Sequence, residues 1–352
     1  MPIFAPDTVE SVAWSERYSR QIVLDYIGPE GQERLGRSTA LVAGVGGLGS
    51  FSAMELARMG VGNLILVDRD VVSYSDLHRQ VLYDERDVGL PKVEAARRKL
   101  STINSEARIE VYGSSVNNVE LMDRLVKKSD VIVDGMDNMA GRYTINSLSV
   151  RNGRPYVFAA AIGLYGNVST IIPGKTPCLE EFYGGLDDSG LPKCATSGVH
   201  PSIVYMTASI CAHEAVNLLV GKTPGLASKL ALIDLRSLSL QYVDLKKSDS
   251  CPVCSGAAFR PREEEVELSC SKDGMATLFV NRPINLDIAV SVRNLKDGGF
   301  SIIDEGAYYV TFGKGSTRGT IFDTGYMVFQ SGRYYRGVED EALKAYEASA
   351  GK

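Results

Sequence analysis

Short apolar runs alternate with amphipathic segments over the first part of the chain. Residues 39–45, 63–67, 108–112 and 130–134 are apolar runs with the length of buried strands. Segments with helical periodicity lie between them, and one begins at Pro91, a residue type suited to the first turn of a helix. Strands that alternate with helices predict a parallel sheet with helices on both faces, the Rossmann-like doubly wound α/β class.

Further elements extend this pattern to residue 256. They are a charged helical segment at 15–37, two strands within 155–173, a long loop rich in Gly, Pro and Asp at 174–198, a mostly apolar helix at 199–220, and strands at 230–235 and 240–245. We therefore expect residues 1–256 to form one domain that the loop at 174–198 crosses. Residues 257–265 combine small residues, a proline and three consecutive acids, a composition that is typical of a linker.

The pattern changes after the linker. Two apolar runs separated by the turn residues SKDG predict a β-hairpin within 266–280. Residues 285–296 fit a helix with Asn285 as its N-cap, although some of their apolar residues alternate as in a strand. Two or three strands follow, so residues 266–335 have the element order of the ubiquitin-like β-grasp fold. A small all-β domain is the alternative, and residues 336–352 are left as a tail.

Composition excludes several functional classes. The chain has 352 residues, of which 44% are hydrophobic and 23% charged, so it can bury a large core. Its net charge of -5 lacks the basic excess of a nucleic-acid-binding protein. No apolar run reaches the roughly 18 residues that span a membrane, and the N-terminal residues lack the pattern of a secretory signal. The six cysteines do not suggest a disulfide scaffold, and the close pair Cys251 and Cys254 indicates metal chemistry in a reducing compartment. We therefore expect a cytoplasmic protein.

A glycine-rich loop follows the first apolar run. Gly44, Gly46 and Gly49 have the spacing of a phosphate-binding loop, at a point where the chain passes from a strand into a helix. Gly47 lies in the same loop. Asp68 closes the next strand, where a carboxylate can bind ribose hydroxyl groups. These features alone fit both the pyrophosphate of NAD and the triphosphate of ATP.

Polar residues beyond the strand ends distinguish these two ligands. Arg79, Gln80 and Lys92 follow the second strand, and Asp137 follows the fourth. In an open α/β sheet such positions meet at the carboxyl ends of the strands, where ligands bind. Cations with one or two carboxylates suit a triphosphate with its Mg²⁺, and hydride transfer has less need of them. The pattern therefore favours ATP with Mg²⁺, and an NAD-dependent oxidoreductase is the alternative from another class.

Together with their neighbours, these residues resemble a known family. The motifs are, in order, RYSRQ, GVGGLGS, the DxD of Asp68 and Asp70, DLHRQ, DVG-x-x-K and DGMDN. They strongly resemble the adenylyltransferases that activate ubiquitin-like proteins. That family includes the thiamine- and molybdopterin-pathway sulfur-carrier adenylyltransferases and the ubiquitin-activating enzymes. The resemblance covers about residues 15–256.

The resemblance implies an activity and a set of cations. In this family the C-terminal glycine carboxylate of a small β-grasp protein ending in Gly-Gly attacks the α-phosphate of ATP and forms an acyl-adenylate. Arg79 and Lys92 resemble the residues that neutralise the triphosphate, with Gln80 beside them. Arg20 resembles an arginine that reaches into the site from the neighbouring subunit of a homodimer.

The resemblance also implies roles for several carboxylates. Asp137 resembles the aspartate that binds Mg²⁺, and Asp68 resembles the one that binds the ribose. Asp70 and the loop glycines match nucleotide-binding positions. Asp76 departs from the family, which usually has Asn there, and an extra carboxylate near phosphates is unfavourable unless it helps to hold a metal or faces away.

Members of this family often hold a structural zinc with two C-x-x-C pairs. The pair Cys251 and Cys254 is complete, whereas Cys178 is followed by Glu181 at the place of its partner. Zinc with Glu181 or another side chain as fourth ligand fits these residues, and so does a vestigial site without metal.

The remaining cysteines leave the final product open. Cys194 precedes the apolar helix, where cysteines of the family can accept the acyl group or take part in sulfur transfer. Cys211 and Cys270 are expected in the core, so the C-terminal part lacks the reactive cysteine of a rhodanese. We expect a ubiquitin-like protein activating enzyme that forms a thioester on Cys194 and passes it to a conjugating enzyme docked on the C-terminal domain. The alternatives are sulfur-carrier adenylation alone, a tRNA-dependent relative and a non-enzymatic scaffold.

Overall fold

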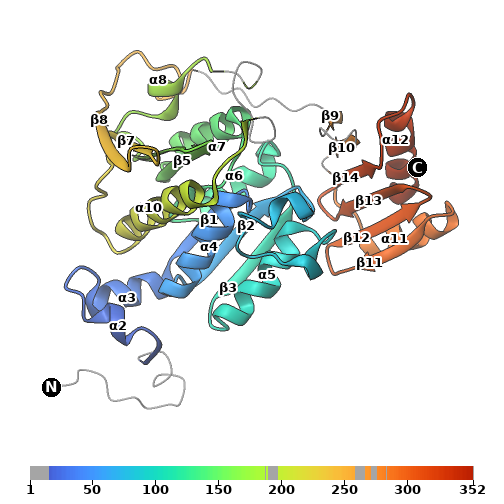
Figure 1. The fold of residues 1–352 in the computed structure, drawn as a ribbon, viewed down its shortest axis with the longest axis horizontal. Helices are drawn as coiled ribbons and strands as arrows, with labels where there is room; N and C mark the ends of the chain where they lie inside the picture. The colour runs from blue at the N-terminus through green and yellow to red at the C-terminus, as the bar shows by residue number, and fades with distance from the viewer. Residues whose placement is uncertain are drawn as a thin grey trace.

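Two sheets organise the protein (Figure 1). The structure is a computed structural model, and it describes residues 16–186, 188, 197–257, 266–270, 276–282 and 284–351. The N-terminal sheet has eight strands and the C-terminal sheet has six. The linker predicted at 257–265 lies outside the described residues except for residue 257.

The N-terminal sheet combines a parallel half with an antiparallel half. Its strand order is β3-β2-β1-β4-β5-β6-β7-β8. Neighbours from β3 to β5 are parallel, and neighbours from β5 to β8 are antiparallel. The strands are β1 (Thr39–Ala43), β2 (Asn63–Asp68), β3 (Arg108–Gly113), β4 (Val131–Asp134), β5 (Tyr156–Ile162), β6 (Tyr165–Ile171), β7 (Lys229–Asp234) and β8 (Ser239–Asp244). The predicted Rossmann-like sheet is confirmed, and its order reverses between β1 and β4.

Helices cover both faces of this sheet because successive strand residues point to opposite sides. In β1, Ala40 and Val42 pack into one buried cluster, and Leu41 and Ala43 pack into another. The first cluster lies beneath α3 (Gly28–Arg37), α4 (Gly47–Met59), α5 (Lys92–Ile103) and α10 (Pro201–Leu219). The second lies beneath α6 (Val119–Lys128), α7 (Met139–Asn152) and α8 (Leu179–Tyr183). Burial on both faces explains why these strands are continuous apolar runs.

The charged segment expected to be helical over 15–37 forms two helices, α2 (Ser19–Ile22) and α3. Gly28 begins α3 with a φ of +62°, a left-handed value that interrupts a continuous helix. Two short 3-10 helices, Tyr74–Asp76 and Glu85–Asp87, lie between β2 and α5. Among the described residues, no helix has the length and apolar character needed to cross a membrane.

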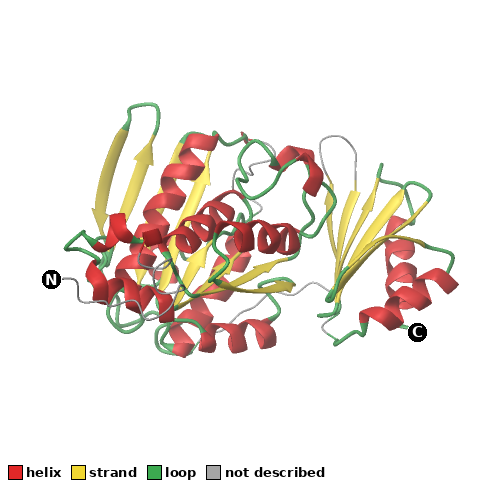
Figure 2. Ribbon diagram, turned by 90° about the horizontal axis from the view of Figure 1, so that it is seen from below, coloured by secondary structure: helices red, strands yellow, loops and turns green. Residues whose placement is uncertain are grey.

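The C-terminal sheet is antiparallel throughout. Its strand order is β11-β12-β13-β14-β10-β9. The strands are β9 (Val266–Cys270), β10 (Ala276–Asn281), β11 (Ser301–Glu305), β12 (Tyr309–Lys314), β13 (Thr317–Phe322) and β14 (Tyr326–Ser331). Helices α11 (Ile288–Asp297) and α12 (Val338–Ala350) pack on one face, as Figure 2 shows. The predicted C-terminal β-rich domain, its hairpin and its first helix are confirmed.

The β-grasp expectation for this domain is wrong. A β-grasp sheet contains a parallel pair of strands, whereas every pair here is antiparallel. The apolar run at 320–329 is divided by a turn at Gly325, which has a φ of +78°. A Cβ added to Gly325 would lie 2.3 Å from the carbonyl oxygen of Arg282, so the turn needs glycine. The run therefore supplies both β13 and β14, and four strands follow α11.

Two further details of this domain differ from expectation. The N-cap of α11 is Asp287 and not Asn285, because the Asp287 carboxylate accepts from the amide of Ala289 at 2.9 Å. Residues 336–352, expected to be a tail, contain α12, whose Tyr346 is buried against the sheet. With two packed helices, the domain is not all-β either.

The other face of the C-terminal sheet packs against the N-terminal part of the protein. Aromatic side chains from this face join the same buried cluster as α4, α5 and α10; they are Phe279, Tyr309, Phe322 and Tyr326. The Phe322 ring lies over Gly113 at the end of β3, where an added Cβ would come within 1.9 Å of it. The hydroxyl of Thr324 donates to the carbonyl oxygen of Gly113 at 2.6 Å. The two sheets therefore share a buried apolar interface.

Helix α4 packs along α10 with an unpaired acid in the contact. One carboxylate oxygen of Glu55 is buried and has no hydrogen-bond partner among the described residues. Burial raises the pKa of Glu55 to about 7, against the smaller lowering effect of a hydrogen bond with Ser209. The folded protein therefore holds this proton more tightly than the unfolded chain does.

The substitution Glu55→Gln is expected to stabilise the protein at pH 8. Because the pKa of Glu55 is raised on folding, its contribution to stability is present below its ordinary value of 4.5 and is lost as the pH rises through 7. Glutamine does not ionise and avoids this loss. We expect the gain to be negligible at about pH 4 and to reach at most about 3 kcal/mol at pH 8. Urea unfolding of both proteins at the two pH values measures it, and a gain independent of pH contradicts the assignment.

Candidate functional site

A glycine-rich turn joins β1 to α4 at the point where the strand order reverses. Gly44 has a φ of +86°, and an added Cβ would lie 2.6 Å from the carbonyl oxygen of Gly135, in the loop after β4. A Cβ on Gly49 would lie 1.8 Å from the carbonyl oxygen of Gly44. Helix α4 follows its N-cap Gly46, and the structure records no side-chain cap hydrogen bond there among the described residues. The turn therefore offers an anion the partly exposed N-terminus of a helix.

Asp68, at the end of β2, ties this turn to the next loop. One carboxylate oxygen accepts from the amide of Val45 at 2.7 Å, and the other accepts from the amide of Asp70 at 2.8 Å. Burial raises the pKa of Asp68 to about 6, although the charge of Lys92 acts in the opposite direction. Each oxygen retains a lone pair for a further donor such as a hydroxyl group.

Lys92 is a buried cation at the first position of α5. Its Nζ lies 3.0 Å from a carboxylate oxygen of Asp70 and 3.7 Å from one of Asp76. Burial acts to lower the pKa of Lys92, but Asp70, Asp76 and Asp68 outweigh it and raise this pKa above its ordinary value. The amine is therefore held in its charged form, close to the carboxyl ends of the strands.

Asp76, where the family usually has Asn, organises the cations of the site. One of its oxygens accepts from the amide and the hydroxyl of Ser73, at 3.0 and 2.9 Å, and so caps the short 3-10 helix. The other accepts from Nε2 of Gln80 at 2.7 Å and lies 3.6 Å from the guanidinium of Arg79. With Lys92 also nearby, this carboxylate lies between two cations, which removes the objection to a negative charge at this position.

Arg79 and Gln80 lie against the glycine turn. A Cβ added to Gly47 would come within 3.7 Å of the Arg79 side chain, and one added to Gly46 would lie 3.9 Å from Nε2 of Gln80. Arg79 is part-exposed and donates to the carbonyl oxygen of Ser75 at 2.7 Å. The side-chain oxygen of Gln80 is buried and lacks a hydrogen-bond partner among the described residues. An unpaired polar atom beside an open helix N-terminus fits a site that receives a polar ligand.

The end of β4 and the loop after it contain two aspartates with different surroundings. Asp137 is exposed, and its carboxylate accepts from the side-chain amide of Asn138 at 2.9 Å. Asp134 is fully buried and accepts from Arg142 at 3.1 Å and from Tyr156 at 2.5 Å. The buried ion pair holds the loop, and the exposed carboxylate is available to a cation.

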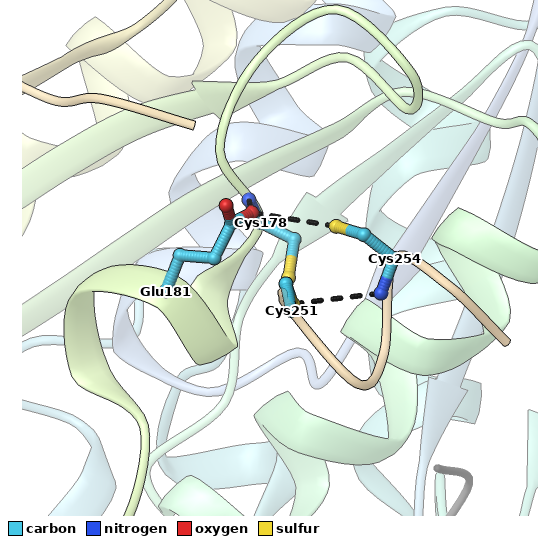
Figure 3. A group of neighbouring side chains, drawn as sticks. All are labelled: Cys178, Glu181, Cys251 and Cys254. Carbon is cyan, nitrogen blue, oxygen red and sulfur yellow. Dashed lines mark hydrogen bonds between the residues drawn. The ribbon is translucent and has the colours of Figure 1, made fainter. Parts of the chain in front are cut away.

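A second cluster contains the three cysteines expected to bind metal, together with Glu181 (Figure 3). Their four ligand atoms lie within 4.8 Å of one another. The sulfurs of Cys178 and Cys251 are 3.6 Å apart, and the sulfur of Cys254 lies 3.3 Å from Oε2 of Glu181. Glu181 is oriented by the amide of Cys178, which donates to the same oxygen at 2.6 Å.

The chemistry of this donor set fits zinc. Three sulfurs and one carboxylate oxygen match the number and type of ligands in tetrahedral zinc sites. Burial raises the pKa of Cys178 to about 11, and burial with the neighbouring Cys178 raises the pKa of Cys254 above its ordinary value. A bound dication would reverse this effect and favour the thiolates. The cluster lies between α8 and the turn at 251–254, so a metal would join these two segments.

The family of the chain follows from comparison with known proteins. The model of the ThiF family matches residues 18–253. The chain belongs to the ThiF family. The match ends before the C-terminal sheet, which begins at residue 266.

Curated relatives of this ThiF-family protein are adenylyltransferases and activating enzymes. The sulfur carrier protein adenylyltransferase of Thermus thermophilus is 34% identical over 261 residues, which is 72% of this chain and 96% of the relative. The SAMP-activating enzyme E1 of Haloferax volcanii is 36% identical, over 68% of this chain and 88% of the relative. A crystal structure of E. coli MccB with ATP has a TM-score of 0.61 at 25% identity, and covers 68% of this chain and 73% of that one. The ThiF-family protein is thus an ATP-dependent adenylyltransferase.

Two residues singled out from the sequence of this ThiF-family protein are not part of the described site. Arg20 is exposed on α2, and no hydrogen bond or ion pair joins it to the described residues of the site. Cys194 lies outside the described residues. Cys211 is fully buried, as expected, whereas nothing is described of the side chain of Cys270.

Sequence reasoning missed three residues that shape the site. Gly135 and Asp134 lie in the DGMDN motif, where attention fell on Asp137, although an acid that ends a buried strand is itself a signal. Asp188 accepts from the amides of Met139 and Ala140, at 2.7 and 3.1 Å, and so caps α7 from the crossover loop. No local sequence pattern predicts that contact, because it joins segments that are distant in the sequence.

Gly49→Ala is expected to destabilise the protein by about 3 kcal/mol and to abolish ATP binding, because the new methyl group would collide with the backbone of Gly44. The matched control is Gly36→Ala in α3, where an added Cβ meets nothing within 4 Å. Thermal unfolding with and without ATP–Mg²⁺ measures both effects. Wild-type stability in Gly49→Ala would show that the turn has another conformation.

Proposed function

We propose that this ThiF-family protein adenylates the C-terminal glycine of a small ubiquitin-like or sulfur-carrier protein ending in Gly-Gly. The observation that carries the proposal is the position of two cations at the carboxyl ends of the parallel strands: Arg79 lies beside the glycine turn, and Lys92 lies between Asp70 and Asp76. Two relatives are named for sulfur carriers and one for the activation of SAMP, which supports a protein substrate.

In the proposed reaction a carboxylate oxygen forms a bond to the α-phosphorus of ATP. The bond from this phosphorus to the oxygen that bridges to the β-phosphate breaks, and pyrophosphate leaves with the electron pair. Both reactants are anions, so their approach requires positive charge around the triphosphate. Lys92 and Arg79 supply two such charges, and the N-terminal amides of α4 add the partial charge of a helix end.

The carboxylates of the site have separate proposed roles. Asp68 accepts ribose hydroxyl groups with the lone pairs that the amides of Val45 and Asp70 leave free. Asp137, which is exposed in the loop after β4, is the proposed ligand of Mg²⁺. When bound, Mg²⁺ neutralises charge on the triphosphate and on the leaving pyrophosphate.

A homodimer completes the proposed site. Arg20 is exposed on α2 and is not engaged by the described residues of its own site, which is compatible with the role of an arginine that enters the site of a neighbouring subunit. In that arrangement a third positive charge would reach the triphosphate.

We end the proposed reaction at the adenylate. A thioester on Cys194 stays a prediction, because Cys194 lies outside the described residues. Among the described residues, the strands of the C-terminal sheet do not have the ubiquitin-like arrangement that suggested a docked conjugating enzyme. Helices α11 and α12 pack on one face of this sheet, and aromatic side chains of the other face pack against the N-terminal part. Sulfur-carrier adenylation without transfer to a conjugating enzyme is therefore the reading that this geometry favours.

We also propose that Cys178, Glu181, Cys251 and Cys254 hold one structural zinc. The proposal rests on the convergence of four ligand atoms from two segments, with Cys178 and Cys251 buried. Bound metal would attach the start of the crossover loop to the end of the domain.

Asp137→Ala is expected to lower carrier-dependent ATP–pyrophosphate exchange at least about a hundredfold, because the proposed Mg²⁺ ligand is lost. Candidate carriers are small β-grasp proteins ending in Gly-Gly from the same genome. The matched control is Asp297→Ala, which removes an exposed aspartate from the end of α11. Both variants should retain the wild-type melting temperature, since neither carboxylate is buried. Exchange at the wild-type rate in Asp137→Ala would remove this residue from the mechanism.

Purified protein is expected to contain about one zinc per chain, and Cys251→Ala to contain none. Cys211→Ala provides the control, because it removes a buried cysteine outside the cluster. Metal analysis by mass spectrometry measures the content, and a chelator should lower the melting temperature of the wild type and of Cys211→Ala, but not that of Cys251→Ala. Wild-type protein prepared in zinc-supplemented medium and still free of zinc would establish a vestigial site.

A further inference from the structure

Arg69 lies between Asp68 and Asp70 in the sequence but points to the C-terminal sheet. Its guanidinium makes two hydrogen bonds to the carboxylate of Glu267 on β9, at 2.6 and 3.1 Å. It also donates to the hydroxyl of Tyr326 on β14 at 3.1 Å and lies 4.0 Å from the ring centroid of Phe279 on β10. Three strands of the C-terminal sheet therefore hold one residue of the loop that carries two nucleotide-site carboxylates.

The geometry of this contact fixes the orientation of the Arg69 guanidinium. A guanidinium with two parallel hydrogen bonds to one carboxylate has little rotational freedom, and stacking on an aromatic ring restricts it further. The side chains of Arg69 and Glu267 are 25% and 44% exposed, so the pair lies at the edge of the interface. The charge of Arg69 also acts on the site, since Arg69 and Lys92 together lower the pKa of Asp70 against the raising effect of burial.

The C-terminal sheet also contacts the segment that carries Lys92. On one side of Lys92, the guanidinium of Arg318 on β13 donates to the carbonyl oxygen of Gly89 at 3.0 Å. On the other side, the hydroxyl of Tyr308 donates to Glu94. Gly89 has a φ of +88°, and an added Cβ would collide with the Arg318 guanidinium, so these two segments of the chain approach closely here.

We propose that the C-terminal sheet is a positioning element of the ATP site, with Arg69 as its main contact. It holds the loop at 68–70 and the segment at 89–94, and these carry Asp68, Asp70 and Lys92. ATP binding and docking of the C-terminal sheet are then coupled, and the coupling acts equally in both directions. This inference rests on the proposed nucleotide roles of those three residues.

Packing within the chain occupies surface on both faces of the C-terminal sheet. One face is covered by α11 and α12, and the other supplies Phe279, Tyr309, Phe322 and Tyr326 to the interface with the N-terminal part. Figure 2 shows the two helices on the side of the sheet that faces away from the N-terminal part. The central strands of the sheet are therefore engaged by other parts of their own chain.

The coupling is tested in the full-length protein with Glu267→Gln, which keeps the shape of the side chain but removes its charge. We expect the Kd of ATP–Mg²⁺, measured by titration calorimetry, to rise about tenfold. Arg69→Gln should have a similar effect, and the double variant should be no worse than either single one, because both substitutions break the same contact. Glu33→Gln is the matched control, since it breaks the surface pair with Arg37 on α3 and should leave the Kd unchanged.

Hydrogen exchange provides the readout that a merely structural role would not affect. ATP–Mg²⁺ is expected to slow amide exchange in β9 and β14 of the wild type, and not in Arg69→Gln. Wild-type Kd values in both Arg69→Gln and Glu267→Gln, or strands β9 and β14 that do not respond to ATP–Mg²⁺, would overturn the coupling. If the wild type bound no ATP–Mg²⁺ in calorimetry, the proposed function itself would fail, and the coupling with it.

Discussion

The direct backbone contact among Gly44, Gly49 and Gly135 is the constraint on which the rest of the site depends. It brings the turn after β1 and the loop after β4 together where the strand order reverses, and a single methyl group at any of the three positions would separate them. Because the contact is made by backbone, it also fixes the direction in which α4 begins. Asp68, at the end of β2, then joins a third strand end to the site, because its carboxylate accepts a hydrogen bond from the amide of Val45.

The buried cation of the site is surrounded by carboxylates of the same chain. Lys92 is buried among the carboxylates of Asp68, Asp70 and Asp76, and burial of a cation is tolerated only when such partners surround it. The arrangement keeps the amine charged and holds it in place. In the proposed function, such a fixed charge would need little reorganisation when a triphosphate binds. Asp76 shows how a residue that departs from its family can serve this balance, since it caps a 3-10 helix and contacts two cations at once.

The C-terminal sheet of this ThiF-family protein packs closely against the part of the chain that the family model matches. The family match ends at residue 253, yet the sheet beyond it packs into the same buried cluster as α4 and α5. Its contacts reach the loops on either side of the nucleotide site through Arg69 and Arg318. The C-terminal sheet, which lies outside the family match, therefore contacts the loops that carry Asp68, Asp70 and Lys92.

The sequence by itself determined the parallel sheet, the glycine turn, the cations at the strand ends and the three cysteines of the metal cluster. The sheet, the turn, the cations and the pair Cys251 and Cys254 depend on local periodicity or on short spacings. Cys178 follows only from the resemblance to the family. Only the tertiary structure decided that Asp134 is buried while Asp137 is exposed, that Glu181 joins the cysteines, and that Arg69 points to the other sheet. It also decided that every strand pair of the C-terminal sheet is antiparallel. These features depend on contacts between residues far apart in the chain, and neither periodicity nor propensity specifies which distant segments meet.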